Sequence, residues 1–412
     1  MIKPTLILLL GTAASQLVAI ASLPVLTRFF SPADFDLLAG VASAIAVYGA
    51  VAALRYEVAI LLPGPVVRSA SLFWLSAVTA LAISTFTAAV FVCISLFTEV
   101  SVGEGGSAIV VIAVLGGLFF SLNLSSINWM LRQRRYGDVA LAKFGQVIAG
   151  VAFQLFAGLL MLPGTYLVIG HCIGVAGGSI YLAIKSFIKD RKVFKRLRLR
   201  GLKAAAWRCR RYPKYSTIEA LLNAGSNHGP VLLIAALANA GEAGYVFIAM
   251  KVVGAPVQLV GGIIGQVYFS RAGEFHATGT LFRSTMWLIG VLFLVGLAAL
   301  VVVGMISEPA IEMMFGEGWG RVSDHVIAFT PWFLAQFITS PVSMSLHVLD
   351  RQKAAMWLQL FGFTLRFGSV LVTGLFAPIY VSTAFAVSGL IFYVAYLGVI
   401  VLALCKYGRL VK

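Results

Sequence analysis

The sequence has few charged residues, and only a minority of these are acidic. Asp, Glu, Lys and Arg make up 11% of its 412 residues, whereas 60% of the residues are hydrophobic and the mean hydropathy is +0.97. This composition leaves too little polar surface to coat a soluble protein of that length. We therefore expect the chain to fold in a lipid bilayer.

The sequence also lacks several chemical signatures. It has no Walker motif for ATP hydrolysis and no alternating polar and apolar pattern of a membrane β-barrel. Its four cysteines are not placed for a periplasmic disulfide, and its histidines lack metal-ligand spacing. We therefore predict no metal, no cofactor and no catalytic residue, and we do not expect an enzyme.

Long apolar runs recur along the whole chain. A spanning helix needs about 20 mostly apolar residues, and only helices or closed barrels satisfy their backbone hydrogen bonds in lipid. The runs predict an all-α integral membrane protein with about twelve transmembrane helices. We place these helices near residues 5–27, 36–62, 69–97, 107–131, 138–161, 164–187, 215–238, 243–269, 282–306, 322–348, 354–376 and 380–405.

Lysine and arginine are concentrated on one set of alternating loops. If both termini lie on the same side, that side holds most of the 31 basic residues, including those at 132–135 and 185–214. The positive-inside rule makes it the cytoplasm. The opposite loops contain Glu99, Glu104, Glu242, Glu308, Glu312, Glu317 and Asp324. The net charge of +16 thus reflects topology and attraction to lipid headgroups, with no indication of nucleic-acid binding.

One long polar connection divides the chain into two sets of six spans. We predict an N-terminal six-helix bundle at 1–187, a basic cytoplasmic loop at 188–214 and a C-terminal six-helix bundle at 215–412. Six spans return the chain to its starting side, so a pseudo-two-fold axis along the membrane normal would relate the bundles. Positive-inside topology explains the basic loop, with binding of anionic lipid or a biosynthetic partner as the alternative.

Two basic residues, Lys251 and Arg366, lie deep within predicted spans. At 1.5 Å per residue, each is roughly 12 to 18 Å from a membrane surface. A Lys or Arg near the bilayer centre costs about 2.5 to 3.5 kcal/mol on insertion scales, so such side chains should face water or a partner. No acidic residue lies at similar depth in the predicted spans. We therefore predict a positive cavity that binds a phosphate-bearing ligand.

Four further residues are candidates for the same site. Arg55 lies near the cytoplasmic end of the second span, with Glu57 within one turn. Arg28, at the periplasmic end of the first span, either binds the phosphate-bearing ligand or marks the interface. Asn223 and Asn227 share one helix face and either contact the ligand or join neighbouring helices. Snorkelling or an internal ion pair is the alternative explanation for each cation.

Other polar positions in the spans are interpreted as packing features. Gln258, Gln266 and Gln336 would link helices through hydrogen bonds worth about 0.6 to 2 kcal/mol each. The pattern GGIIG at 261–265 would let two helices approach closely. Prolines within or beside the spans, including Pro24, Pro230 and Pro256, invite kinks and would permit rocking motions.

Three stretches carry a family resemblance. They are PVLTRFFSPADF at 24–35 followed by LRYEVAI at 54–60, YPKY at 212–215 leading to LNA at 222–224, and AGY at 243–245 continuing through Pro256 to QVYF at 266–269. In these stretches the chain resembles lipid-linked oligosaccharide flippases of the O-antigen and polysaccharide type, from the superfamily that also holds multidrug and toxic compound extruders. The resemblance covers nearly the whole chain and departs at Asp36, where that family commonly has glycine.

The resemblance implies two helical bundles around a central cavity. It also implies transport of an undecaprenyl-pyrophosphate-linked oligosaccharide from the cytoplasmic to the periplasmic leaflet of a bacterial inner membrane, for O-antigen and lipopolysaccharide biosynthesis. Alternating access, with the anionic headgroup on Arg55, Lys251 and Arg366, is the expected mechanism. A polysaccharide polymerase or glycosyltransferases would be its protein partners.

Two other functions compete with the flippase. An antiporter that extrudes cationic drugs should hold buried carboxylates, and the excess of buried Lys and Arg argues against it. A membrane glycan polymerase or ligase should have a large periplasmic loop that carries catalytic residues. The longest periplasmic loop predicted here lies near 307–321, which is too short for that role.

Overall fold

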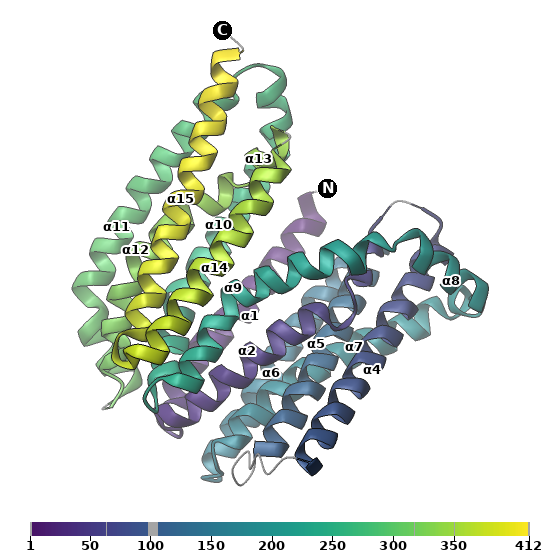
Figure 1. Ribbon diagram of the computed structural model, residues 1–412, viewed down its shortest axis with the longest axis horizontal. Helices are drawn as coiled ribbons and strands as arrows, with labels where there is room; N and C mark the ends of the chain where they lie inside the picture. Colours follow the sequence, from purple (N-terminus) through teal and green to yellow (C-terminus); the bar gives the residue numbers. More distant parts are fainter. Residues whose placement is uncertain (1, 63, 98–105, 317, 350, 411–412) are drawn as a thin grey trace. The chain divides into compact units, whose positions relative to one another are not determined.

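The computed structural model of the protein consists of α-helices joined by short connections (Figure 1). It describes residues 2–62, 64–97, 106–316, 318–349 and 351–410, and these residues contain no β-strand. Glu99, Glu104 and Glu317, which entered the topology prediction, lie outside them. The predicted all-α fold class is confirmed.

The chain forms two compact units. The first unit comprises Met1–Phe30 and Leu37–Leu232, and the second comprises Ser31–Asp36 and Leu233–Lys412.

Up to residue 237 the helices are α1 (Ile2–Leu26), α2 (Pro32–Ala52), α3 (Tyr56–Ala59), α4 (Val66–Phe97), α5 (Gly106–Arg132), α6 (Tyr136–Leu159), α7 (Thr165–Phe194), α8 (Leu199–Arg208), the π-helical turn η1 (Tyr212–Ser216) and α9 (Thr217–Leu237). They are followed by α10 (Glu242–Ala277), α11 (Leu281–Phe315), α12 (Arg321–Val342), α13 (Ser345–Val348), α14 (Gln352–Phe376), the short 3₁₀ helix η2 (Pro378–Tyr380) and α15 (Val381–Leu410).

Each of the twelve predicted spans contains one long helix, and two of them, at 36–62 and 322–348, contain a short helix as well. Among the described residues, ten helices are long and apolar enough to cross a membrane: α1, α2, α4, α5, α6, α7, α10, α11, α14 and α15. The remaining two, α9 and α12, are more polar. α9 contains two asparagines and a histidine between residues 223 and 228, and α12 begins with RVSDH. A polar span is tolerated where it faces protein or water instead of lipid.

Two of the predicted spans are interrupted, and the basic segment between the two halves contains helices. The span at 36–62 is broken, because α2 ends at Ala52 and Leu54 and Arg55 adopt left-handed φ angles of 50° and 60°. The span at 322–348 separates into α12 and α13. The basic segment at 188–214 is largely helical, since α7 continues to Phe194 and α8 follows. α8 is held by Ala205 and Cys209, which pack in a cluster with residues of α4.

The same order of helix contacts occurs inside each unit. In the first, α1 packs on α6, α6 on α7, α7 on α5, and α5 on both α4 and α2. In the second, Leu237 of α9 packs on Gly374 of α14, α14 packs on α15, α15 on α12, and α12 on both α11 and α10. Each helix thus has a counterpart six spans later. The packing supports the relation between the two halves that the two sets of six spans suggested.

Residues 31–36 pack against the start of α10. The Asp36 carboxylate accepts hydrogen bonds from the backbone N–H groups of Gly241 and Gly244, the latter at 2.6 Å. Backbone N–H groups at a helix N-terminus lack intrahelical partners, so a carboxylate there is stabilising. Asp36, the position at which the chain departs from the flippase pattern, is therefore a cap of α10.

Gly244 provides a direct test of this packing. A Cβ atom at Gly244 would lie 2.4 Å from the carbonyl oxygen of Pro32, which is backbone and cannot move aside easily. We expect Gly244→Ala to lower the free energy of unfolding by about 1 to 3 kcal/mol, measured by thermal unfolding in detergent. Gly290→Ala is the control, since no atom lies within 4 Å of its added Cβ. Equal melting temperatures for the two variants would contradict the close packing.

Candidate functional site

One face of α10 carries an exposed polar stripe. Lys251, Gln258, Gly262 and Gln266 are all exposed, and the last three follow Lys251 by seven, eleven and fifteen residues. At about 100° per residue these positions lie within roughly 80° of one another around the helix. Exposing an ammonium and two amides to hydrocarbon would be costly. This face of α10 is therefore expected to meet water.

A cavity of about 340 Å³ lies beside this stripe, between α10 and α12. It is lined by Val257, Gln258, Gly261, Gly262, Gly265, Gln266, Gln336, Ser340 and Met344. The glycines of the GGIIG pattern have two different surroundings. A Cβ atom added at Gly265 would lie 3.3 Å from Cα of Pro341. A Cβ atom added at Gly262 would have no atom within 4 Å. The glycines therefore let α12 approach at one point and leave a hollow at another.

Arg366 lies inside the second unit, among aromatic rings. Only 1% of the residue is exposed, and its guanidinium carbon is 4.7 Å from the ring centroid of Trp332 and 5.2 Å from that of Phe385. Gly389 makes room for Trp332, because a Cβ at that position would lie 2.4 Å from the indole. Arg366 therefore has ring faces as partners and does not face open water in this conformation.

Arg55 lies at the break between α2 and α3. Its Nη1 atom is 3.3 Å from Oε1 of Glu57, whose side chain is only 3% exposed, while 30% of the Arg55 side chain is exposed. Asn128 of α5 donates a 3.1 Å hydrogen bond to the carbonyl oxygen of Glu57. Left-handed backbone at a residue other than glycine costs about 1 to 2 kcal/mol and is concentrated at functional sites. The ion-pair explanation considered for Arg55 is thus realised, on a strained backbone that remains accessible.

The other three candidates belong to the first unit, where Asn223 is exposed and Asn227 is half-buried. Arg28 is exposed in the turn after α1. The Asn227 amide donates to the backbone carbonyl of Asn223 at 2.9 Å and to its side-chain oxygen at 3.3 Å. The asparagines are the predicted site residues that contact one another. Arg28, Arg55, Asn223 and Asn227 belong to the first unit, whereas Lys251 and Arg366 belong to the second.

Sequence reasoning did not place the three glutamines at a cavity. Gln258, Gln266 and Gln336 were interpreted as links between helices, yet all three line the cavity. One signal in the sequence could have distinguished Gln258 and Gln266 from residues that only pack helices together. Both lie on the same helix face as Lys251. The contribution of Gln336 comes from another helix and could only be found from the structure.

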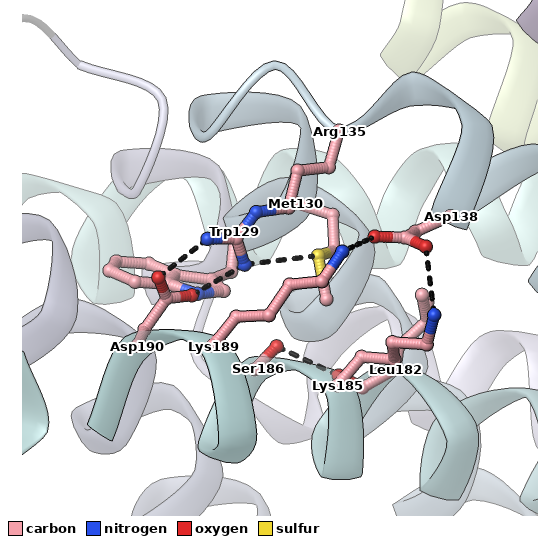
Figure 2. A network of polar contacts seen from close by, with 9 residues as sticks. All are labelled: Trp129, Met130, Arg135, Asp138, Leu182, Lys185, Ser186, Lys189 and Asp190. Carbon is pink, nitrogen blue, oxygen red and sulfur yellow. Dashed lines mark hydrogen bonds and ion pairs between the residues drawn. The ribbon is translucent and has the colours of Figure 1, made fainter.

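Figure 2 shows a network of ion pairs that joins α5, α6 and α7 at the side of the first unit predicted to be cytoplasmic. Arg135 forms two hydrogen bonds with the carboxylate of Asp190, at 2.6 and 2.7 Å. The indole N–H of Trp129 donates to the same carboxylate at 2.9 Å. Lys185 and Lys189 both contact Asp138, at 3.3 and 2.9 Å. The positive-inside pattern placed these residues together but did not predict their pairing.

Buried carboxylates in the described residues have basic partners. Besides Glu57 and Asp190, the buried acid is Glu242 at the start of α10. Its Oε2 atom is 2.8 Å from Nη2 of Arg321, and its Oε1 atom is 3.2 Å from Nε2 of His325. These carboxylates serve ion pairs within the protein. In the residues that the structure describes, no group of three or more His, Cys, Asp or Glu side chains is arranged to hold a metal ion.

Comparison with known proteins places these features in a family. Residues 25–324 match the family model described as polysaccharide biosynthesis protein. The chain belongs to this family. The match covers more than half of the chain and extends across both units, so it includes the break at Arg55 and the polar stripe of α10. No curated protein matches the sequence.

Solved structures share the fold of this polysaccharide biosynthesis protein. An inward closed conformation of the lipid II flippase MurJ is similar, with a TM-score of 0.72, 15% identity and coverage of 98% of this chain and 90% of the other. An inward-facing multidrug resistance transporter of the MATE family is also similar, with a TM-score of 0.61, 12% identity and coverage of 98% and 95%. A transporter of the MOP superfamily from Pyrococcus furiosus gives a TM-score of 0.57 at 11% identity, with coverage of 98% and 95%. At these identities the similarity establishes the fold.

Proposed function

We propose that this protein flips an undecaprenyl-pyrophosphate-linked oligosaccharide from the cytoplasmic to the periplasmic leaflet of a bacterial inner membrane. Three observations support the proposal: the polysaccharide biosynthesis family, a fold shared with a lipid II flippase, and an exposed lysine beside neutral polar groups on α10. The lysine is the observation that carries it, because an ammonium within a membrane-spanning helix attracts a diphosphate. The product would enter O-antigen or lipopolysaccharide biosynthesis, with a polymerase or glycosyltransferases as partners.

In the proposed mechanism the anionic headgroup binds first at the accessible cations. Lys251 takes the pyrophosphate on the watered face of α10, and Arg55 attracts it at the break after α2. Arg366, shielded by Trp332 and Phe385 in this conformation, becomes a second contact after these rings move. The prolines inside α1, α9 and α10 weaken the backbone hydrogen bonding locally, which favours alternating access by rocking. Transport of this kind requires no catalytic residue.

Drug extrusion by an antiporter is the second candidate, because transporters of the MATE family share the fold. A binding site for cationic drugs needs an available carboxylate. The buried carboxylates described here are engaged by arginine, and none of the side chains that line the cavity is acidic. These facts favour an anionic substrate.

Leaflet-resolved detection of the lipid-linked glycan tests the proposal. In cells without the protein, we expect the glycan to accumulate on the cytoplasmic leaflet. Lys251→Met should give the same accumulation, with roughly 10- to 100-fold slower transport, because a hydrogen bond to a charged group contributes about 1.5 to 3 kcal/mol. Lys251→Arg keeps the charge and should transport.

The controls separate transport from folding and from drug export. Membrane abundance of each variant is compared by immunoblot, and ethidium accumulation is measured in the same cells. An unchanged leaflet distribution in cells without the protein would remove the flippase proposal. Increased ethidium retention without any change in the glycan would favour the antiporter.

A further inference from the structure

The cavity between α10 and α12 combines empty space with neutral hydrogen-bonding groups. Gly262 faces space with no atom within 4 Å of an added Cβ, and the surrounding wall includes Gln258, Gln266 and Gln336. Ser340 adds a hydroxyl, whereas Val257 and Met344 are apolar. All of these residues belong to the second unit, so the cavity is formed within one compact body.

The glutamine amides around this cavity have unused hydrogen-bonding capacity. Each amide offers two N–H donors and a carbonyl acceptor. Among the described residues, none of the three amides donates to or accepts from another side chain or backbone group. Placing an amide in an apolar environment without a partner is unfavourable, so water or a ligand must occupy these groups. Three amides on two helices are more than helix association requires.

We infer that this cavity binds a sugar of the lipid-linked glycan, which is an inference that rests on the proposed function. Sugars carry many hydroxyl groups that both donate and accept, and amide side chains match them in both roles. The C–H faces of a sugar ring suit the apolar part of the wall. A phosphate would need a cation, and no basic residue lines the cavity.

The position of the cavity relative to Lys251 supports this assignment. Gln258 follows Lys251 by seven residues, which is roughly 10 Å along α10. In the predicted topology the start of α10 is periplasmic, so the cavity lies on the cytoplasmic side of Lys251. A pyrophosphate at Lys251 would then place its attached sugars beside the glutamines, on the side from which the glycan is loaded. Lys251 would select the diphosphate and the cavity would select the sugar.

Binding measurements with two lipids test the inference. Purified protein in nanodiscs is titrated with undecaprenyl pyrophosphate, which has no sugar, and with undecaprenyl-pyrophosphate-linked glycan extracted from the organism that makes the protein. The double variant Gln258→Leu/Gln336→Leu removes two amides at similar volume. We expect its affinity for the glycan-bearing lipid to fall about 10-fold, with unchanged affinity for undecaprenyl pyrophosphate.

A second variant and a matched control keep the experiment decisive. Gly262→Leu fills the cavity and leaves every amide in place, and it should cause the same selective loss. Gln359→Leu replaces a glutamine of α14 that does not line the cavity, and it should bind both lipids normally. Melting temperatures confirm that each variant is folded.

The outcomes distinguish the inference from the proposed function. Selective loss of glycan affinity in both cavity variants supports the sugar site. Unchanged affinity for both lipids, or an equal loss for both, overturns the sugar site and leaves the flippase proposal intact. If the unmodified protein binds neither lipid, the proposed function is overturned and this inference with it.

Discussion

Replacing Asp190 with alanine is expected to lower the free energy of unfolding by about 3 to 5 kcal/mol, because it leaves a partly buried arginine without its partner. The Asp190 side chain is only 8% exposed and accepts two hydrogen bonds from Arg135 and one from Trp129 (Figure 2). It also lies at a kink in α7, where its backbone leaves helical geometry with φ −113°. The pair therefore joins α5, α6 and α7 at the point where α7 bends.

Denaturant titration in detergent micelles measures this loss, and two further variants make it specific. Lys189→Gln removes a surface partner of Asp138 whose side chain is 44% exposed, and it should cost less than about 1 kcal/mol. The double variant Arg135→Met/Asp190→Leu replaces both charges by apolar groups and should recover most of the stability. If Asp190→Ala and Lys189→Gln cost the same, the buried pair does not have the role given to it here.

The helices were predictable because apolar length is a strong local signal. About 20 consecutive apolar residues identify a span whatever its neighbours are, and each predicted span corresponds to a long helix. The break at Leu54 and Arg55 was not predictable in this way. Both residues have side chains compatible with a helix, and next to their left-handed backbone the carbonyl oxygen of Glu57 accepts a hydrogen bond from Asn128 on α5. Hydropathy contains no information on such contacts.

For the cations of the candidate site, the sequence predicted the positions but not the surroundings. Their rarity within apolar segments was sufficient to single out Lys251 and Arg366. Their environments differ, since Lys251 is exposed on α10 and Arg366 is enclosed by Trp332 and Phe385. These rings come from α12 and α15, which are distant from Arg366 in sequence. Contacts between distant segments, like the pairing of Arg135 with Asp190, require the tertiary structure.

The contrast between these two cations defines the last prediction. Arg366→Met is expected to give a protein at least as stable as the original, because an apolar side chain of similar length replaces a buried charge. Transport should nevertheless fall roughly 30- to 5,000-fold, since losing a buried charged contact to the pyrophosphate costs about 2 to 5 kcal/mol. A buried arginine is expensive in a membrane, and its cost is understandable if the charge is needed during the transport cycle. Leaflet-resolved detection of the glycan and melting temperatures are measured on the same preparation. Normal transport by Arg366→Met would show that the arginine serves packing against Trp332 and Phe385. Arg366→Lys retains a charge without the planar guanidinium, so its transport rate would show whether charge alone is sufficient.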